Sequence, residues 1–82
     1  MKYFRKHPEA LKAAKWYSLH LQTNLFGGLD VICRWGRVDN PRRTERIEPF
    51  STQQEAITRL ETLSVERVRS GFALVEPLSL AA

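Results

Sequence analysis

The sequence predicts an α+β domain in which one main helix packs across one face of an antiparallel β-sheet of four to five strands. Residues 16–22 and 29–38 are rich in β-favouring side chains, and the glycine-containing stretch 23–28 separates them. Residues 51–71 carry the capping, spacing and stop signals of a helix. The expected strands are residues 2–6, 16–22, 29–38, 44–50 and 72–77.

The composition is that of one small globular domain spanning residues 1–82, with 43% apolar and 27% charged residues. Thirteen Lys and Arg against nine Asp and Glu give a net charge of +4, which favours an acidic partner such as nucleic acid. Cys33 is the only cysteine, so an intrachain disulfide is excluded. The sequence lacks a run of roughly 20 apolar residues and a secretory h-region, so we expect a cytoplasmic protein without membrane contact.

The N-terminal segment, residues 1–15, is predicted to add a strand and a turn of helix to the main sheet-and-helix unit of residues 16–77. Residues 2–6 favour the strand. Pro8 stands at the first position of the helical turn within residues 7–15, where its missing N–H is not needed.

Residues 16–22 and 29–38 are expected to pair as an antiparallel hairpin. The first of these segments alternates cleanly between two faces. If the turn at 23–28 closes symmetrically about its middle, Trp16 lies opposite Trp35.

This register places Trp16, Trp35 and Arg37 together on the face away from the helix. Arg34 then falls on the core side, so its charge must reach the rim of the sheet with its stem packed. A one-residue slip, or a bulge near Gly36, reverses the assignment. The side chains assigned to the face under the helix are Tyr17, Leu19, Leu21 and Ile32.

The main helix is predicted over about residues 52–70. Ser51 or Thr52 is the N-cap, with Gln or Glu three residues on as the capping-box partner. Gly71 fits a left-handed helix stop. The stripe with helical spacing comprises Ala56, Ile57, Leu60, Leu63, Ser64, Arg67 and Val68.

Arginines surround a tryptophan at residues 34–37. An aromatic face beside guanidinium groups is suited to hold an exposed base or sugar next to its phosphate. Gly36 would let a ligand backbone approach closely. The alternative is that Trp35 is a core residue and that Gly36 relieves crowding. The candidate nucleic-acid-binding residues are Trp35, Gly36, Arg37, Arg34, Arg42, Arg43, Arg46 and Trp16.

Catalytic and metal sites are not expected. Cys33 and His20 can approach each other across the hairpin, but no third group orients them as a nucleophile and base. His7 and His20 lie too far apart in the pattern for a metal pair. We therefore expect a chain that is not an enzyme and that needs no cofactor.

Five ordered segments span nearly the whole chain: KWYSLHL (15–21), LFGG (25–28), RWGRV (34–38), FSTQQEAITRLETL (50–63) and RVRSGF (67–72). Together they resemble the WGR domain family, which occurs as small bacterial proteins and as a module of DNA-dependent poly(ADP-ribose) polymerases. The chain departs from the family pattern after residue 38, where many members have glycines and a glutamine and this chain has DNPRRT.

The resemblance implies a twisted antiparallel sheet with one helix across it. In the polymerases the module contacts DNA near a strand break and also docks neighbouring domains. By this resemblance, Trp35 would stack on a terminal nucleotide, and Arg37 would contact a terminal phosphate or a partner surface. Gly36 would keep the approach open.

Two functions follow from these observations. The first is a non-catalytic module that binds DNA ends, nicks or exposed termini with weak sequence preference. The alternative is a protein-interaction module that docks a partner through Trp35 and Arg37. If Arg42, Arg43 and Arg46 lie on the face of Trp35, DNA binding is favoured. If they lie on opposite sides, protein docking is favoured.

Overall fold

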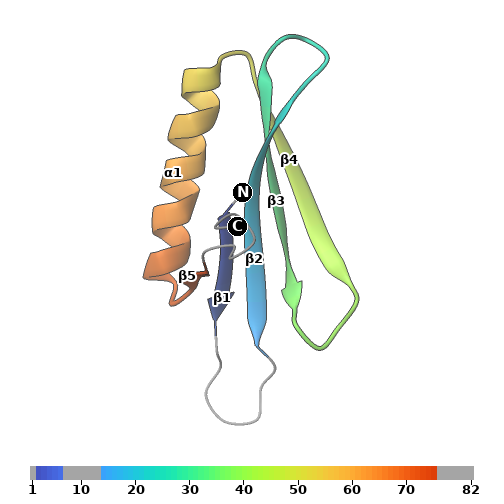
Figure 1. Cartoon of the computed structure of the whole chain (residues 1–82), viewed down its shortest axis with the longest axis vertical. Coiled ribbons are helices and arrows are strands. Elements are labelled where there is room, and N and C mark those ends of the chain that lie inside the picture. The colour runs from blue at the N-terminus through green and yellow to red at the C-terminus, as the bar shows by residue number, and fades with distance from the viewer. Residues whose placement is uncertain (1, 7–13, 76–82) are drawn as a thin grey trace, which may run out of the picture.

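The computed structural model describes residues 2–6 and 14–75 and confirms the predicted α+β architecture. Five antiparallel strands form one sheet in the order β4-β3-β2-β1-β5, and α1 runs lengthwise along one face of it (Figure 1). The elements are β1 (Lys2–Lys6), β2 (Lys15–Thr23), β3 (Leu29–Arg37), β4 (Arg43–Phe50), α1 (Gln53–Arg69) and β5 (Ala73–Val75).

The ends of these elements lie within one residue of the predicted ends wherever the structure describes both. The helical turn expected within 7–15 falls largely on residues 7–13, which lie outside the described part of the chain, and Lys15 belongs to β2. The last two residues of the strand expected at 72–77 also lie outside the described residues.

Both ends of α1 carry the predicted caps. Thr52, and not Ser51, is the N-cap, and its Oγ1 accepts a hydrogen bond from the backbone N–H of Glu55 at 3.2 Å. At the other end Gly71 has a φ of +96°, and the N–H groups of Gly71 and Phe72 donate to carbonyls of the last helical turn. No helix in the described residues has the length and apolarity to cross a bilayer.

The core lies between α1 and the sheet face that we call the helix face. Because side chains alternate along a strand, the odd-numbered residues of β2 and β3 share this face. The opposite face, which we call the outer face, carries no helix within the described chain. The buried residues of the core are Phe4, Tyr17, Leu19, Val31, Cys33, Ala56 and Leu63.

The pairing of β2 with β3 differs by one residue from the predicted register. Tyr17, and not Trp16, lies opposite Trp35, while Trp16 lies opposite Gly36. Trp35 and Arg37 therefore belong to the helix face, and the prediction that they lie on the face away from the helix is wrong.

Two further predictions are wrong because of the same one-residue shift in the β2–β3 register. Ile32, which was expected under the helix, lies on the outer face, although it is buried there. Arg34 also lies on the outer face, where it forms an ion pair with Glu45, so its stem does not need to cross the core. The residues correctly assigned to the helix face are Tyr17, Leu19 and Leu21.

The loop between β2 and β3 causes this shift because it contains an odd number of residues. Thr23 pairs with Leu29, which leaves residues 24–28 in the loop. The side chain of Asn24 closes it, since its Oδ1 accepts hydrogen bonds from the N–H groups of Phe26 at 3.0 Å and Gly28 at 2.9 Å. An odd loop moves every residue of β3 to the face opposite the one that a symmetric turn predicts.

Gly36 is explained by neighbouring protein atoms without a ligand. A Cβ at this position would lie 2.9 Å from the carbonyl oxygen of Arg42 and 3.1 Å from Nε1 of Trp16. The indole of Trp16 thus lies against Gly36 on the outer face, where the sequence suggested an open approach for a ligand.

We expect Gly36→Ala to lower the free energy of unfolding by about 1–3 kcal/mol, because the added methyl group overpacks the contact with Trp16 and the backbone of Arg42. Urea unfolding measures the change. Gly27→Asn is the matched control: Gly27 has open space around it and a φ of +81°, which asparagine tolerates. Equal stability of Gly36→Ala and the wild type would contradict the close contact.

Candidate nucleic-acid interface

Trp35 lies half-buried at the margin of the core, between an aromatic and a small neighbour. Tyr17 of β2 pairs with it, and the two rings stack with centroids 5.7 Å apart and planes 12° apart. On β4, which is an edge of the sheet, the paired residue is the exposed Thr44. On the side of the indole away from Tyr17 the directly paired residue is therefore a small side chain, which leaves room for another planar group.

A polar hollow of about 320 Å³ adjoins Trp35, between α1 and strands β2, β3 and β4. We call it the arginine pocket. Arg46 enters it from β4, whereas Arg59 and Arg67 enter from α1, two turns apart on one face of the helix. The full lining is Tyr17, Trp35, Arg46, Arg59, Leu63, Glu66 and Arg67.

Arg67 has a guanidinium group that the described residues leave without a polar partner. Its Cζ lies over the ring of Tyr17 at 4.8 Å from the centroid and over that of Phe72 at 6.0 Å. Its Nε is buried, and no acceptor within the described residues bonds to it. A buried N–H without an acceptor is costly, so an anionic group bound in the pocket would be stabilised here.

The other two arginines of the pocket share one carboxylate. Arg46 Nη2 donates to Glu48 Oε2 at 2.8 Å, and Arg59 Nε donates to Glu48 Oε1 at 3.0 Å. The hydrogen bond from Arg59 is the main cause that holds the pKa of Glu48 below its ordinary value, and it raises the pKa of Arg59 in return. Glu66 lines the pocket and Glu48 is bound to two of its arginines, so three arginines against two glutamates leave one net positive charge.

Tyr17 supports the pocket as a neutral ring. Burial is the main cause that raises the pKa of Tyr17 to about 12, with the neighbouring Cys33 contributing in the same direction. The phenol therefore stays protonated at physiological pH and adds no negative charge beside Arg67. It presents a π face to the guanidinium and to Trp35.

Of the predicted arginines, two share the face of Trp35. Arg46 lines the arginine pocket with Trp35. Arg37 is two residues from Trp35 on the same face, but it is exposed and forms an ion pair with Asp39 at 3.2 Å. Arg42 lies exposed in the turn between β3 and β4.

The remaining predicted residues lie on the outer face. Arg43 pairs with Gly36 in the register, and Arg34 is bound to Glu45. Trp16 stacks with Tyr3 at a centroid distance of 6.2 Å. Arg34, Arg43 and Trp16 are thus separated by the sheet from Trp35 and do not form one site with it.

Arg59 and Arg67 are absent from the predicted set of binding residues, although they supply two of the three cations in the pocket. Their signal in the sequence is a spacing of four residues on either side of Leu63, which is buried. An arginine one turn before and one turn after a core position lies at the margin of the helix–sheet interface.

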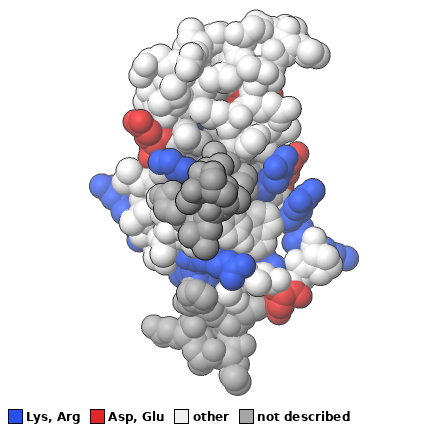
Figure 2. All heavy atoms as spheres, viewed as in Figure 1, with Lys and Arg blue, Asp and Glu red and all other residues white. Residues whose placement is uncertain are grey.

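In Figure 2 the basic side chains lie across the middle and lower part of the surface, on the side of α1 and on the side of β4, with acidic side chains among them. The other end of the molecule, formed by the β2–β3 loop and the start of α1, is almost free of charge in this view. Among the described residues, no cluster of three or more His, Cys, Asp or Glu side chains is placed to hold a metal ion.

The lowered pKa of Glu48 predicts a pH-dependent contribution to stability. The contribution is complete above the unfolded-state pKa of about 4.5 and is lost as the pH falls through the lower folded-state pKa. We expect Glu48→Gln to be less stable than the wild type at pH 7, and the difference to shrink below about pH 4.5. Urea midpoints measured from pH 7 to pH 3 test this; a constant difference would contradict it.

Comparison with known proteins agrees with this architecture and motif. The model of the WGR domain matches residues 2–77, which is nearly the whole chain and includes every strand and the helix. Searches of the curated proteins and of the solved structures gave no match. The match covers Trp35 and the arginine pocket as well as the sheet, and on this basis the chain belongs to the WGR domain family, a family of non-catalytic domains.

Proposed function

We propose that this chain is a non-catalytic nucleic-acid-binding module for DNA ends, nicks or exposed single-stranded termini. The observation that carries the proposal is the buried Nε of Arg67, which no acceptor within the described residues binds, beside the stacked rings of Tyr17 and Trp35. Aromatic surfaces next to cations hold unpaired bases together with their phosphates. Membership of the WGR family and the net charge of +4 support the proposal.

In the proposed complex, a terminal base or sugar stacks on the free side of Trp35, above Thr44. Its phosphates reach the guanidinium groups of Arg46 and Arg67, and Arg37 meets the backbone on the solvent side. A base inside a duplex is not available for such stacking, which favours ends and single strands. Phosphate contacts carry no sequence information, so the preference among sequences is weak.

Filling the space beside Trp35 tests the stacking step. In Thr44→Tyr the new ring occupies the place of the nucleotide, and we expect the dissociation constant for a single-stranded oligonucleotide to rise at least about fivefold. Fluorescence anisotropy measures it. Ile47→Tyr is the matched control, because it adds the same ring to the outer face of the same strand and leaves the charge unchanged. Equal affinity of the two variants would contradict stacking at Trp35.

The salt dependence of binding tests the phosphate contacts. If about four phosphates are neutralised, the slope of log K against log salt is about −2.8 on single strands and about −3.6 on duplex DNA. Arg67→Met keeps the packed stem over Tyr17 and removes the charge, so the slope should become shallower by about 0.7–0.9. Arg69→Met, in the same helical turn but outside the arginine pocket, is the control for net charge. A slope that Arg67→Met leaves unchanged would exclude Arg67 from the contact.

Two observations favour the protein-docking alternative. Arg43 and Arg46 lie on opposite faces of the sheet, and Arg37 and Arg46 are already held in ion pairs. Trp and Arg are typical of the centres of protein interfaces. A DNA titration followed by backbone NMR, with blunt, nicked and single-stranded DNA, separates the two functions. Shifts at Trp35 and Arg67 support nucleic-acid binding, whereas unchanged spectra with all three DNAs leave docking as the function of this surface.

A further inference from the structure

The loop between β2 and β3 exposes two large apolar side chains next to each other. Leu25 is 99% exposed and Phe26 is 95% exposed. They belong to the end of the molecule that is nearly free of charge in Figure 2, and Asp30 is the only charged residue within 22–30. We call these two side chains the knob. A pair of adjacent, fully exposed large apolar residues is typical of a contact surface.

The knob is held in place by its own loop. Asn24 Oδ1 accepts from the N–H of Phe26, Asn24 Nδ2 donates to Asp30 Oδ1 at 3.2 Å, and the backbone N–H of Asn24 donates to the carbonyl of Gly28 at 3.0 Å. A loop closed by these bonds loses little further backbone freedom when the knob is buried by a partner. The loop therefore presents Leu25 and Phe26 in a prepared conformation.

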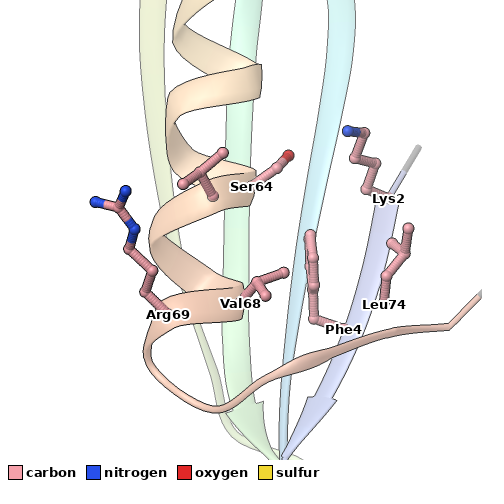
Figure 3. A pocket seen from close by; sticks show the side chains of 7 residues that line it. Lys2, Phe4, Ser64, Val68, Arg69 and Leu74 are labelled. Atoms are coloured by element: carbon pink, nitrogen blue, oxygen red, sulfur yellow. The ribbon is translucent and has the colours of Figure 1, made fainter.

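An apolar groove of about 400 Å³ lies on the other side of α1, between the helix and strands β1 and β5. Figure 3 shows Val68 directed from the helix toward Phe4, with Leu74 beside Phe4 on the strand side. Val68 is 56% exposed and Leu74 is 44% exposed, so the groove leaves much apolar surface in solvent. Its full lining is Lys2, Phe4, Ser64, Val65, Val68, Arg69 and Leu74.

We propose that the knob of one copy of this chain docks into the groove of a second copy. The groove has room for two apolar side chains and offers an aliphatic and aromatic lining. The charges also match, because both charged residues of the groove, Lys2 and Arg69, are cations and the charge beside the knob is the carboxylate of Asp30. Within the described residues, Lys2 has no ion pair.

In a head-to-tail contact the knob of one copy fills the groove of the other, so the pair as a whole keeps one free groove and one free knob. Two side chains bury far less than the ~1,200 Å² of a stable complex, so the association is weak and reversible. The arginine pocket lies on the opposite side of α1 and stays accessible in the associated chains. This inference is independent of the proposed nucleic-acid binding.

Dilution of the full-length chain, followed by backbone NMR from about 1 mM downwards, tests the contact because millimolar binding remains visible there. Concentration-dependent shifts are expected at the knob, Leu25 and Phe26, and at the groove, Val68 and Leu74. The double variant Leu25→Ser, Phe26→Ser and the single variant Val68→Asp should each abolish the shifts at both surfaces. Val38→Asp is the matched control, since Val38 is similarly exposed but lies outside the groove.

A mixture of the two variants provides the decisive measurement. The knob variant keeps an intact groove, and the groove variant keeps an intact knob. Each should be monomeric alone, whereas the mixture should restore shifts at the groove of the first and the knob of the second. Labelling one variant at a time with ¹⁵N separates the two sets of signals. If Val68→Asp does not fold, Val65→Asp replaces it, because Val65 is exposed and also lines the groove.

Three results would overturn the proposal. The first is a wild-type spectrum that does not change with concentration. The second is self-association that persists in the knob variant, which would assign the groove to another occupant. The third is a mixture of the two folded variants in which no shifts return, because the intact knob of one variant then does not bind the intact groove of the other.

Discussion

Asn24 accepts hydrogen bonds from two N–H groups of its own loop and so closes β2 and β3 around residues 24–28. Side chains alternate along a strand, so the odd length of this loop decides which face each residue of β3 occupies. Trp35 meets Tyr17 and the helix because of it, and Arg34 is left outside the core. The same hydrogen bonds hold the knob in place. This one loop therefore determines both the face on which Trp35 lies and the position of Leu25 and Phe26.

The position of α1 gives the molecule two hollows of different chemistry. The helix packs against β2, β3 and β4 and also contacts β5 at the other edge of the sheet. The hollow toward β4 is lined by arginines, and the hollow toward β5 is lined by aliphatic side chains. The two hollows share no lining residue, so the nucleic acid and the apolar knob that we propose as ligands would not compete for the same residues.

Much of the architecture could be predicted from the sequence because its signals are local. The predicted ends of the helix and strands lie within one residue of the observed ends. The signals that located them were the caps at Thr52 and Gly71 and the alternation in β2. The register was predicted wrongly because a symmetric turn over 23–28 was assumed, whereas the Asn24 loop holds five residues. The charge of Arg34, which that register placed toward the core, was the signal in the strand against it. Arg59 and Arg67 were missed for a related reason: whether a helical arginine meets a tryptophan depends on how the helix lies on the sheet.

The two ion pairs of Glu48 have a consequence for the arginine pocket that concerns competition between anions. In the unbound chain, the carboxylate of Glu48 already occupies the guanidinium groups of Arg46 and Arg59, much as a phosphate would. A ligand phosphate that binds these two arginines must replace the carboxylate of Glu48. The binding free energy therefore includes only the difference between the two anions. No carboxylate among the described residues binds the Nε of Arg67, so a phosphate bound there would displace no anion and its binding free energy would be more favourable. In the proposed complex, Arg67 would therefore contribute more to phosphate binding than Arg46 or Arg59, because these two must first give up Glu48.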